Sequence, residues 1–560
     1  MHPALSIPEI VWSVCNELVT QKDDANGDGP GYDVHTRALA ACARTCRAFY
    51  MPAVTALWKH DNLTIEIILL HCMPQDFWER KPNTQSACAE LLYPKRSVLP
   101  ADVQRVMFHA PLVNQLSFGR AADGRSFTAY SRNGMEETGL SEEGYEAISS
   151  VLPHPVFVNL RHLFWYTSGA SLSHIRPYLP PSLSSLMLKI SRSARPHISE
   201  LSDLAVRCPY VTSFTLDTKN YNGDVEDVKA LHSRLVQAWD LHSLESTILE
   251  HSTLVHVAQL SSLRQLINFR TDILRWKPIS LAANAFASVR QLNLQRIDMR
   301  LCIDLLQSCV FKALEALELS PCNPATGDWT KLYRALRAAH TQPQLLRYLE
   351  IMQWNLDQTN AQHHDPVTDS DIFPLLGFTG LCSVELECQG GFDLEPKTLE
   401  RMAGAWSDLS HLSLRGIERP QWQRRLTLHA LVPFAIKCTE LQGLALEFDG
   451  TGVSFDQNPP RPETPSSLVS LTVEWSPINS SRAVAAFLSI YFPRLLIVDT
   501  AEGLPGKRWG RVGGLVKVFA RIREHERMEA AGTAPPKFTW HIKVDDRELE
   551  SDSSSDEEDE

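Results

Sequence analysis

The sequence contains no long uninterrupted apolar run, and its N-terminus has no basic stretch followed by an apolar block. The first absence argues against a membrane-spanning helix, and the second argues against a secretory signal. The 12 cysteines follow no regular spacing, and many stand within apolar stripes, so a disulfide framework is not expected. We therefore expect a cytoplasmic or nuclear protein with reduced thiols and no membrane partner.

Motifs for bond chemistry are also missing. The sequence has no GxSxG, HExxH or GxGxxG pattern, and the glycine-rich segment 503–514 lacks the spacer and the hydroxyl residue of a phosphate-binding loop. Cys42 and Cys46 share an apolar stripe, and the adjacent His363 and His364 have no further ligand candidates nearby, so neither pair predicts a metal site. No basic stripe interleaved with aromatic residues suggests nucleic-acid binding. We expect neither catalysis, nor a cofactor, nor a bound metal ion.

The composition is that of a folded protein, with 44% hydrophobic and 21% charged residues. Its 560 residues suffice for several domains or for one extended repeat array. The formal net charge is −12, and the last eleven residues contain seven acids. We predict a disordered acidic tail over 546–560, preceded by a C-terminal cap over 501–545.

Three short amphipathic segments occupy the first sixty residues. The first follows Ser6 and Glu9, which stand at the spacing of a capping box. The second has Thr36 as its candidate N-cap, and Pro52 is expected to open the third. The apolar positions are Ile7, Ile10, Val11, Val14, Cys15 and Leu18, then Leu39, Cys42, Cys46 and Phe49, then Val54, Leu57 and Trp58. These stripes offer more apolar surface than so small a core needs, which predicts that a partner covers part of it.

Leu5-x-Ile7-Pro8-Glu9-Ile10, Thr45-Cys46-Arg47-x-Phe49 and Leu57-Trp58 resemble the start, middle and end of the F-box signature. A Gly- and Asp-rich insert over 20–35, typical of a flexible loop, separates the first two parts. The resemblance implies an F-box-like domain over 1–60 that binds a Skp-type linker protein. The residues implied in that contact are Leu5, Ile7, Pro8, Ile10, Val11, Val14, Leu39, Cys46, Phe49, Leu57 and Trp58. An ordinary helical cap on the following domain is the alternative.

From residue 101 onward, an apolar residue n is repeatedly followed by apolar residues at n+3 and n+5. The strong copies start at Leu160, Leu183, Val211, Val289, Leu314, Leu346, Leu381, Leu409, Leu441 and Leu468, and weaker ones at Leu112, Leu244, Leu263 and Leu495. This spacing predicts a short strand whose n+3 and n+5 side chains enter a core. Segments such as 398–406 and 428–437 have helical periodicity and would form an outer layer.

The repeats resemble leucine-rich-repeat solenoids, and we place that region at 101–500. The family's Asn or Cys at n+8 is matched only by Cys322, so we expect irregular repeats. Residues 61–100 contain a dense apolar run and are predicted to form a buried helical junction. The predicted fold class is α/β, with a three-helix F-box-like domain followed by an irregular leucine-rich-repeat solenoid. A leucine-rich but non-repeating α/β domain is the alternative.

The whole pattern resembles fungal-type F-box/leucine-rich-repeat proteins. The resemblance implies a non-catalytic, substrate-recruiting subunit of an SCF-type ubiquitin ligase, which would connect a Skp-type linker protein and a cullin to a protein target. Residues n+2, n+4 and n+6 point away from the core, onto the face where solenoids usually bind. The candidates there are His162, Phe164, Tyr166, Glu318, Glu350, Glu385, Glu387, Glu447 and Glu474. The acids among them predict a basic target, and the alternative is that they only solvate an exposed sheet. A repeat scaffold without ligase association is the alternative.

Overall fold

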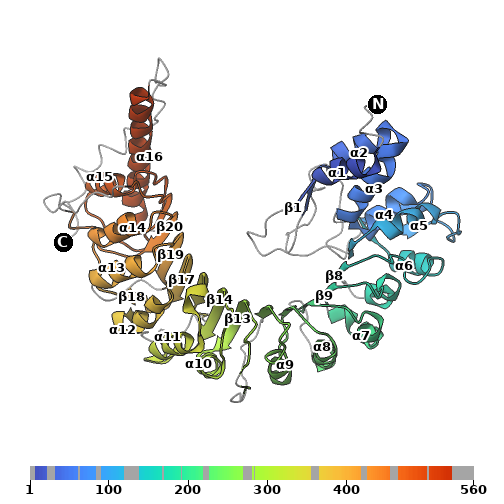
Figure 1. Cartoon of the computed structure of the whole chain (residues 1–560), viewed down its shortest axis with the longest axis horizontal. Coiled ribbons are helices and arrows are strands. Elements are labelled where there is room, and N and C mark those ends of the chain that lie inside the picture. The colour runs from blue at the N-terminus through green and yellow to red at the C-terminus, as the bar shows by residue number, and fades with distance from the viewer. Residues whose placement is uncertain are drawn as a thin grey trace. The chain divides into compact units, whose positions relative to one another are not determined.

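The computed structural model divides the chain into two compact units, each with an α/β fold (Figure 1). Unit 1 comprises Met1–Ile297 and Ser308–Leu314, and unit 2 comprises Asp298–Gln307 and Glu315–Glu560. The structure describes residues 7–21, 32–60, 63–82, 90–118, 138–166, 170–190, 192–218, 226–268, 281–282, 284–354, 365–417, 425–453, 464–500 and 504–531. Within these ranges, no helix combines the length and the apolar character needed to cross a bilayer.

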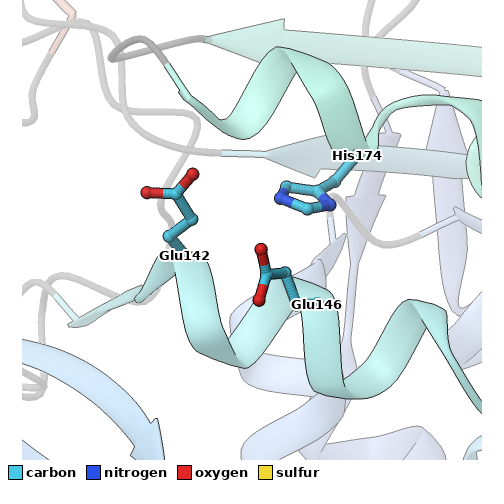
Figure 2. Close-up of side chains that lie close together, drawn as sticks. All are labelled: Glu142, Glu146 and His174. Atoms are coloured by element: carbon cyan, nitrogen blue, oxygen red, sulfur yellow. The ribbon is translucent and has the colours of Figure 1, made fainter.

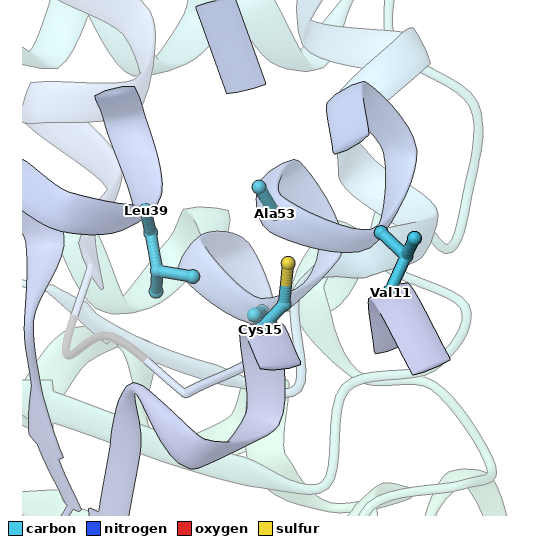
Figure 3. Packing of buried hydrophobic residues seen from close by; sticks show 5 residues of the cluster. Val11, Cys15, Leu39 and Ala53 are labelled. Carbon is cyan, nitrogen blue, oxygen red and sulfur yellow. The ribbon is translucent and has the colours of Figure 1, made fainter. Parts of the chain in front are cut away.

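Three helices at the start of unit 1 enclose a small core (Figure 3). They are α1 (Pro8–Glu17), α2 (Thr36–Thr45) and α3 (Arg47–His60). The core consists of Val11, Cys15, Leu39, Ala53 and Ala56, all almost fully buried. The antiparallel strands β1 (Val19–Gln21) and β2 (Tyr32–Val34) lie between α1 and α2. Helices therefore stand where the three amphipathic segments are predicted.

The predicted starts of these helices are wrong in detail. The N-cap of α1 is Ile7, which has no side-chain cap, and Ser6 lies outside the described residues. Thr36 is the first residue of α2 instead of its cap. Pro52 lies inside α3 instead of opening it, because extended backbone at Cys46 (φ −162°, ψ 167°) ends α2 and lets α3 begin one residue later.

The rest of unit 1 is built on a parallel sheet with the strand order β13-β12-β11-β10-β9-β8-β6-β3. These strands are β3 (Leu63–Thr64), β6 (Gln115–Phe118), β8 (His162–Tyr166), β9 (Ser185–Lys189), β10 (Ser213–Asp217), β11 (Ser243–Ser246), β12 (Gln265–Asn268) and β13 (Gln291–Asp298). A smaller sheet contains β4 (Trp78–Pro82), β5 (Glu90–Pro94) and β7 (Thr138–Leu140). The predicted junction 61–100 thus contributes strands to both sheets and is only partly helical.

Helices and 3₁₀ turns connect these strands on one side of the sheet (Figure 1). They are α4 (Ile65–Cys72), α5 (Gln104–His109), η2 (Ala110–Leu112), α6 (Glu142–Ser149), η4 (Ala170–His174), η5 (Arg176–Tyr178), η6 (Arg192–Leu201), α7 (Leu204–Arg207), α8 (Glu226–Ala238) and α9 (His251–Val257). In α4, Ile65, Ile68 and Leu69 are at most 1% exposed, so this part of the junction is buried as predicted.

Unit 2 repeats the arrangement with the strand order β22-β21-β20-β19-β17-β15-β14. The strands are β14 (Ala316–Cys322), β15 (Tyr348–Met352), β17 (Ser383–Cys388), β19 (His411–Gly416), β20 (Gly443–Leu446), β21 (Ser470–Thr472) and β22 (Ile497–Asp499), and a separate parallel pair joins β16 (Val367–Thr368) to β18 (Phe392–Asp393). The helical elements are α10 (Met299–Ser308), α11 (Asp328–Ala339), η7 (Pro343–Leu345), α12 (Asp369–Ile372), η8 (Phe373–Gly377), α13 (Pro396–Ala405), η9 (Leu428–Leu431), α14 (Val432–Lys437), α15 (Ser481–Tyr491) and α16 (Leu504–Ala530).

The predicted repeat pattern describes the core of both units. In all ten strong copies, the residues at n, n+3 and n+5 are at most 2% exposed. For two weaker copies, the predicted register is wrong. Leu244 pairs with Phe214 and therefore occupies n+3 of a copy that starts at Leu241, and the copy assigned to Leu112 starts one residue later, at Val113. Both units are thus mixed α/β structures with long parallel sheets, consistent with a leucine-rich-repeat-like solenoid.

Polar side chains accept hydrogen bonds from backbone N–H groups of neighbouring repeats. In unit 1, Thr247 Oγ1 accepts a hydrogen bond of 2.8 Å from the backbone N–H of Thr218. In unit 2, Gln353 Oε1 accepts one of 2.8 Å from the N–H of Gln389, and Ser476 Oγ accepts one of 3.0 Å from a backbone N–H. Buried backbone donors are satisfied in this way by residues of several types, which a search for Asn at n+8 does not find.

The glycine-rich segment within the predicted C-terminal cap is helical from Leu504 onward. Helix α16 begins at Leu504 and contains Gly506, Gly510, Gly513 and Gly514, each of which lowers helix propensity by about 1 kcal/mol. Trp509, Val512 and Val516 on this helix are at most 2% exposed, and the Trp509 indole donates a 2.7 Å hydrogen bond to the Ser476 carbonyl. Apolar burial therefore offsets the weak local propensity.

Candidate protein-interaction surfaces

Helix α1 divides its apolar residues between the core and the surface. Val11 and Cys15 are at most 1% exposed, whereas Ile7, Ile10 and Val14 are 44%, 37% and 39% exposed. At 100° per residue, these last three lie on one strip beside the buried strip. We call Ile7, Ile10 and Val14 the α1 face. The three helices already form their core without these residues, so this exposed apolar strip is a candidate contact for another protein.

The other residues predicted to contact a linker protein occupy different environments. Pro8 is exposed, Leu39 is buried in the core, and Phe49 and Leu57 are half-buried against it. Cys46 is half-buried, and Leu5 lies outside the described residues. The structure also exposes Trp12, Tyr50 and Met51 by 37% to 41%, and none of the three falls on a predicted apolar stripe. The binding role of each residue stays a prediction.

Trp58 already has a partner within the chain. Its indole stacks on the imidazole of His109 in α5, with ring centroids 4.2 Å apart and an interplanar angle of 2°. His109 is 7% exposed, and burial lowers its pKa, with a further contribution from nearby Arg105. The neutral ring suits an aromatic stack. Trp58 therefore helps to fix α3 against the sheet region of unit 1.

A row of carboxylates crosses three neighbouring strands of unit 2. Glu318 on β14 is opposite Glu350 on β15, and Glu350 is opposite Glu385 on β17. All three are half-buried and project away from the buried n+3 and n+5 residues. Neighbouring strands lie about 4.8 Å apart, so like charges are close. We call Glu318, Glu350 and Glu385 the glutamate row.

The glutamate row is not fully ionised at neutral pH. Burial, together with the charges of Glu350 and Glu385, raises the pKa of Glu318 to about 7. Burial, together with Glu350, also raises the pKa of Glu385. The Tyr348 hydroxyl donates a hydrogen bond to Glu350. Because like charges on adjacent strands resist simultaneous ionisation, Glu318 carries its proton for part of the time at pH 7.

We expect Glu318→Gln to change how stability depends on pH. A carboxyl whose pKa is raised in the folded state favours folding fully below its ordinary pKa of about 4.5, and that contribution disappears as the pH rises through 7. After allowance for solvent exposure, the effect is about 1 kcal/mol. Thermal denaturation measures this effect. The thermal midpoint of Glu318→Gln relative to that of the parent should be higher at pH 8 than at pH 5. Glu315→Gln, at an exposed position, is the control; equal pH profiles for parent and Glu318→Gln would contradict the prediction.

Arg415 neutralises part of the remaining acidic surface of unit 2. Its guanidinium lies 3.0 Å from the Glu387 carboxylate and 3.9 Å from that of Glu474. Burial raises the pKa of Glu387, and Arg415 opposes that rise. Glu447, the other acid predicted on this face, is half-buried. The acidic character of the face is therefore strongest along the glutamate row.

The corresponding face of unit 1 carries mostly polar side chains. Ser243, Gln265 and Gln291 lie opposite one another on three strands and form side-chain hydrogen bonds of 2.7 and 2.9 Å. Lys189 and Asp217 form an ion pair of 3.6 Å at the end of the neighbouring strands. His162 and Phe164, from the predicted aromatic start, are half-buried on β8, and the side chain of Tyr166 lies outside the described residues.

Comparisons with known proteins assign no family. No protein-family model matches the chain, and no curated protein sequence matches it. Internalin (inlF) from Listeria monocytogenes has a solved structure that is 13% identical, with a TM-score of 0.30, over 63% of this chain and 86% of its own. A chain of the yeast Rad7 and Elc1 complex is 13% identical, with a TM-score of 0.34, over 72% of this chain and 83% of its own. Likeness at this level supports no conclusion about function.

Proposed function

We propose that this chain is a substrate-recruiting subunit of an SCF-type ubiquitin ligase. In this proposal the α1 face binds a Skp-type linker protein, the linker connects the chain to a cullin, and the repeats hold a protein target. The observation that carries the proposal is the exposed strip of Ile7, Ile10 and Val14 beside a closed core. The F-box-like segments fall on the same three helices, and this agreement is what selects a Skp-type partner.

The open sheet surfaces support the second half of the proposal. Strand side chains at n+2, n+4 and n+6 project from a backbone that is fixed by continuous parallel pairing, for example from β14 through β15 and β17 to β19. A rigid array of this kind presents side chains from many repeats to one partner. The chain itself would catalyse no reaction, and the ligation chemistry would belong to the other subunits of the ligase.

A repeat scaffold without ligase association is the alternative, and the first experiment separates the two. We expect the tagged full-length chain to co-purify a Skp-type protein together with a cullin. Recovery of neither protein under conditions in which a known F-box protein recovers both would favour the scaffold.

We expect Ile10→Asp to weaken capture of the Skp-type protein. Full burial of an isoleucine side chain contributes about 1.5 to 3 kcal/mol, and part of Ile10 is already covered, so the loss is about 1.5 kcal/mol or about tenfold in affinity. A pull-down with purified Skp-type protein measures it, and circular dichroism checks the fold. Asn16→Asp adds the same charge at an exposed position of α1 that lies away from the α1 face, and it should bind like the parent. Equal capture by Ile10→Asp would place the contact elsewhere.

A further inference from the structure

Two elements of unit 1 bring together three side chains that are known metal-ligand types. Glu142 and Glu146 lie four residues apart and therefore on one face of α6, and His174 ends η4 (Figure 2). One ligand atom from each residue lies within 4.8 Å of those of the other two. In Figure 2, the imidazole of His174 faces the carboxylates of both glutamates. The cluster lies outside the surfaces described above.

The imidazole of His174 is held in place and has an unused nitrogen. Its ring stacks on that of Tyr145, with centroids 5.6 Å apart and an interplanar angle of 5°. Its Nε2 is shielded from solvent and has no hydrogen-bond partner in the part of the chain that the structure describes. Burial lowers the pKa of His174, and the charges of Glu146 and Glu142 oppose that shift. A shielded nitrogen without a partner is unfavourable unless a ligand occupies it.

The backbone that carries the two glutamates is also fixed. Ser141 caps α6 by accepting a 3.1 Å hydrogen bond from the N–H of Gly144, and Tyr145 and Ile148 are buried. A Cβ added at Gly144 would lie 3.3 Å from the Leu92 carbonyl oxygen, so the helix lies very close to β5. The Glu142 and Glu146 carboxylates remain exposed. Two or three water molecules could therefore complete a coordination sphere without any change in the backbone.

We propose that Glu142, Glu146 and His174 bind one divalent transition-metal ion, with Zn²⁺ as the reference ion. Ligand atoms at about 2.0 to 2.2 Å from Zn²⁺ lie closer to one another than the 4.8 Å that bounds the present separations, and rotation of the two exposed glutamate side chains can bring them together. An imidazole nitrogen with two carboxylates suits Zn²⁺, Co²⁺ or Mn²⁺, whereas Ca²⁺ and Mg²⁺ prefer oxygen ligands alone. The bound ion would link α6 to η4 and stabilise unit 1. This inference is independent of the proposed ligase function.

Isothermal titration calorimetry of the metal-free, full-length chain with Zn²⁺ tests the site. We expect one site of highest affinity, weakened at least tenfold by Glu146→Gln and by His174→Ala. Glu143→Gln is the matched control, because Glu143 is an exposed glutamate on the same helix and is outside the cluster. It should leave the affinity unchanged. Equal affinities for the parent and both cluster variants would overturn the site and assign any binding to the other histidines and cysteines of the chain.

A second measurement covers the case in which His174→Ala fails to fold because it loses the stack on Tyr145. Glu146 is exposed, so Glu146→Gln should fold like the parent. Zn²⁺ should raise the thermal midpoint of the parent and of Glu143→Gln by several degrees, and should raise that of Glu146→Gln by much less, because only binding to the folded state stabilises it. The same rise in all three proteins would overturn the proposal, as would an equal rise with Ca²⁺.

Discussion

Replacing His232 by leucine should make the protein markedly more resistant to acid. His232 lies on α8 with 0% exposure, its ring packs on Phe214 at 5.9 Å, and neither ring nitrogen has a hydrogen-bond partner among the described residues. Burial lowers the pKa of His232 from 6.5 to about 4. In the unfolded chain the ring regains its ordinary pKa, so the unfolded state takes up a proton between about pH 6.5 and pH 4 and the folded state does not.

Because of that difference, the buried histidine makes the parent less stable as the pH falls. The contribution of a histidine with a lowered pKa is fully present above pH 6.5 and decreases as the pH falls below it. Between pH 7.5 and pH 4.5, the free energy of unfolding of the parent should fall by about 2.5 kcal/mol through this residue alone. The free energy of unfolding of His232→Leu should not show this fall. Urea denaturation at the two pH values measures the difference. His251→Leu, at an exposed position on α9, should behave like the parent. Parallel pH profiles for parent and His232→Leu would show that the buried ring is not the titrating group.

The repeats could be predicted because the core requires apolar side chains at fixed positions. Burial of n, n+3 and n+5 in every strong copy reflects strands that alternate sides and a preceding residue that closes the turn. The prediction failed where polar residues enter the core. Ser246 and Asn268 occupy n+5 in adjacent copies, and the Asn268 amide donates a 3.0 Å hydrogen bond to the Ser246 carbonyl. The repeat at Leu241 therefore lacks its third apolar position, so the apolar pattern predicts a start at Leu244 instead.

Helix boundaries were predicted less well because they depend on contacts distant in sequence. Cys46 continues an apolar stripe, yet its extended backbone separates α2 from α3. The glycines of 503–514 indicate a loop by local propensity, yet Trp509 and Val512 gain enough burial to make the segment helical. Neither outcome can be read from a window of ten residues, because the decisive energy comes from packing against other elements.

The candidate sites show the same division between local and distant information. The α1 stripe is visible in sequence, but only the fold separates Ile10 at the surface from Val11 in the core. The glutamate row combines residues 32 and 35 positions apart in consecutive repeats, so the repeat spacing alone predicts it. The Glu142, Glu146 and His174 cluster is not periodic. Glutamates four residues apart are common on helices, and nothing in the sequence indicates which histidine lies beside them.

The acidity of the glutamate row is the property most directly relevant to the choice of target. Glu387 and Glu474 share Arg415, which also opposes the rise in the pKa of Glu385 on the same strand as Glu387. Glu350 lies one strand farther from that cation in the sheet order. Burial and, after it, repulsion between the carboxylates raise the pKa of Glu318 and Glu385, and a basic partner would relieve the repulsion. Binding of such a partner should therefore be tighter at pH 8 than at pH 6, because the partner binds the ionised row.

Reversing Glu350 and Glu385 to lysine should abolish this binding, and a lysine-rich synthetic peptide is a suitable probe while the target is unidentified. Each reversal removes an attraction and adds a repulsion, and at about 0.5 to 1 kcal/mol for each exposed charge pair the two reversals together cost about 2 to 4 kcal/mol. That corresponds to about a hundredfold loss of affinity, measurable by fluorescence anisotropy. Asp408→Lys with Glu440→Lys makes the same change in net charge at exposed positions before β19 and β20, and should bind like the parent.

Parent binding should also weaken as salt increases from about 0.05 to 0.3 M, because exposed charges are screened. Equal binding by the reversed protein and the parent would mean that targets are recognised on another surface.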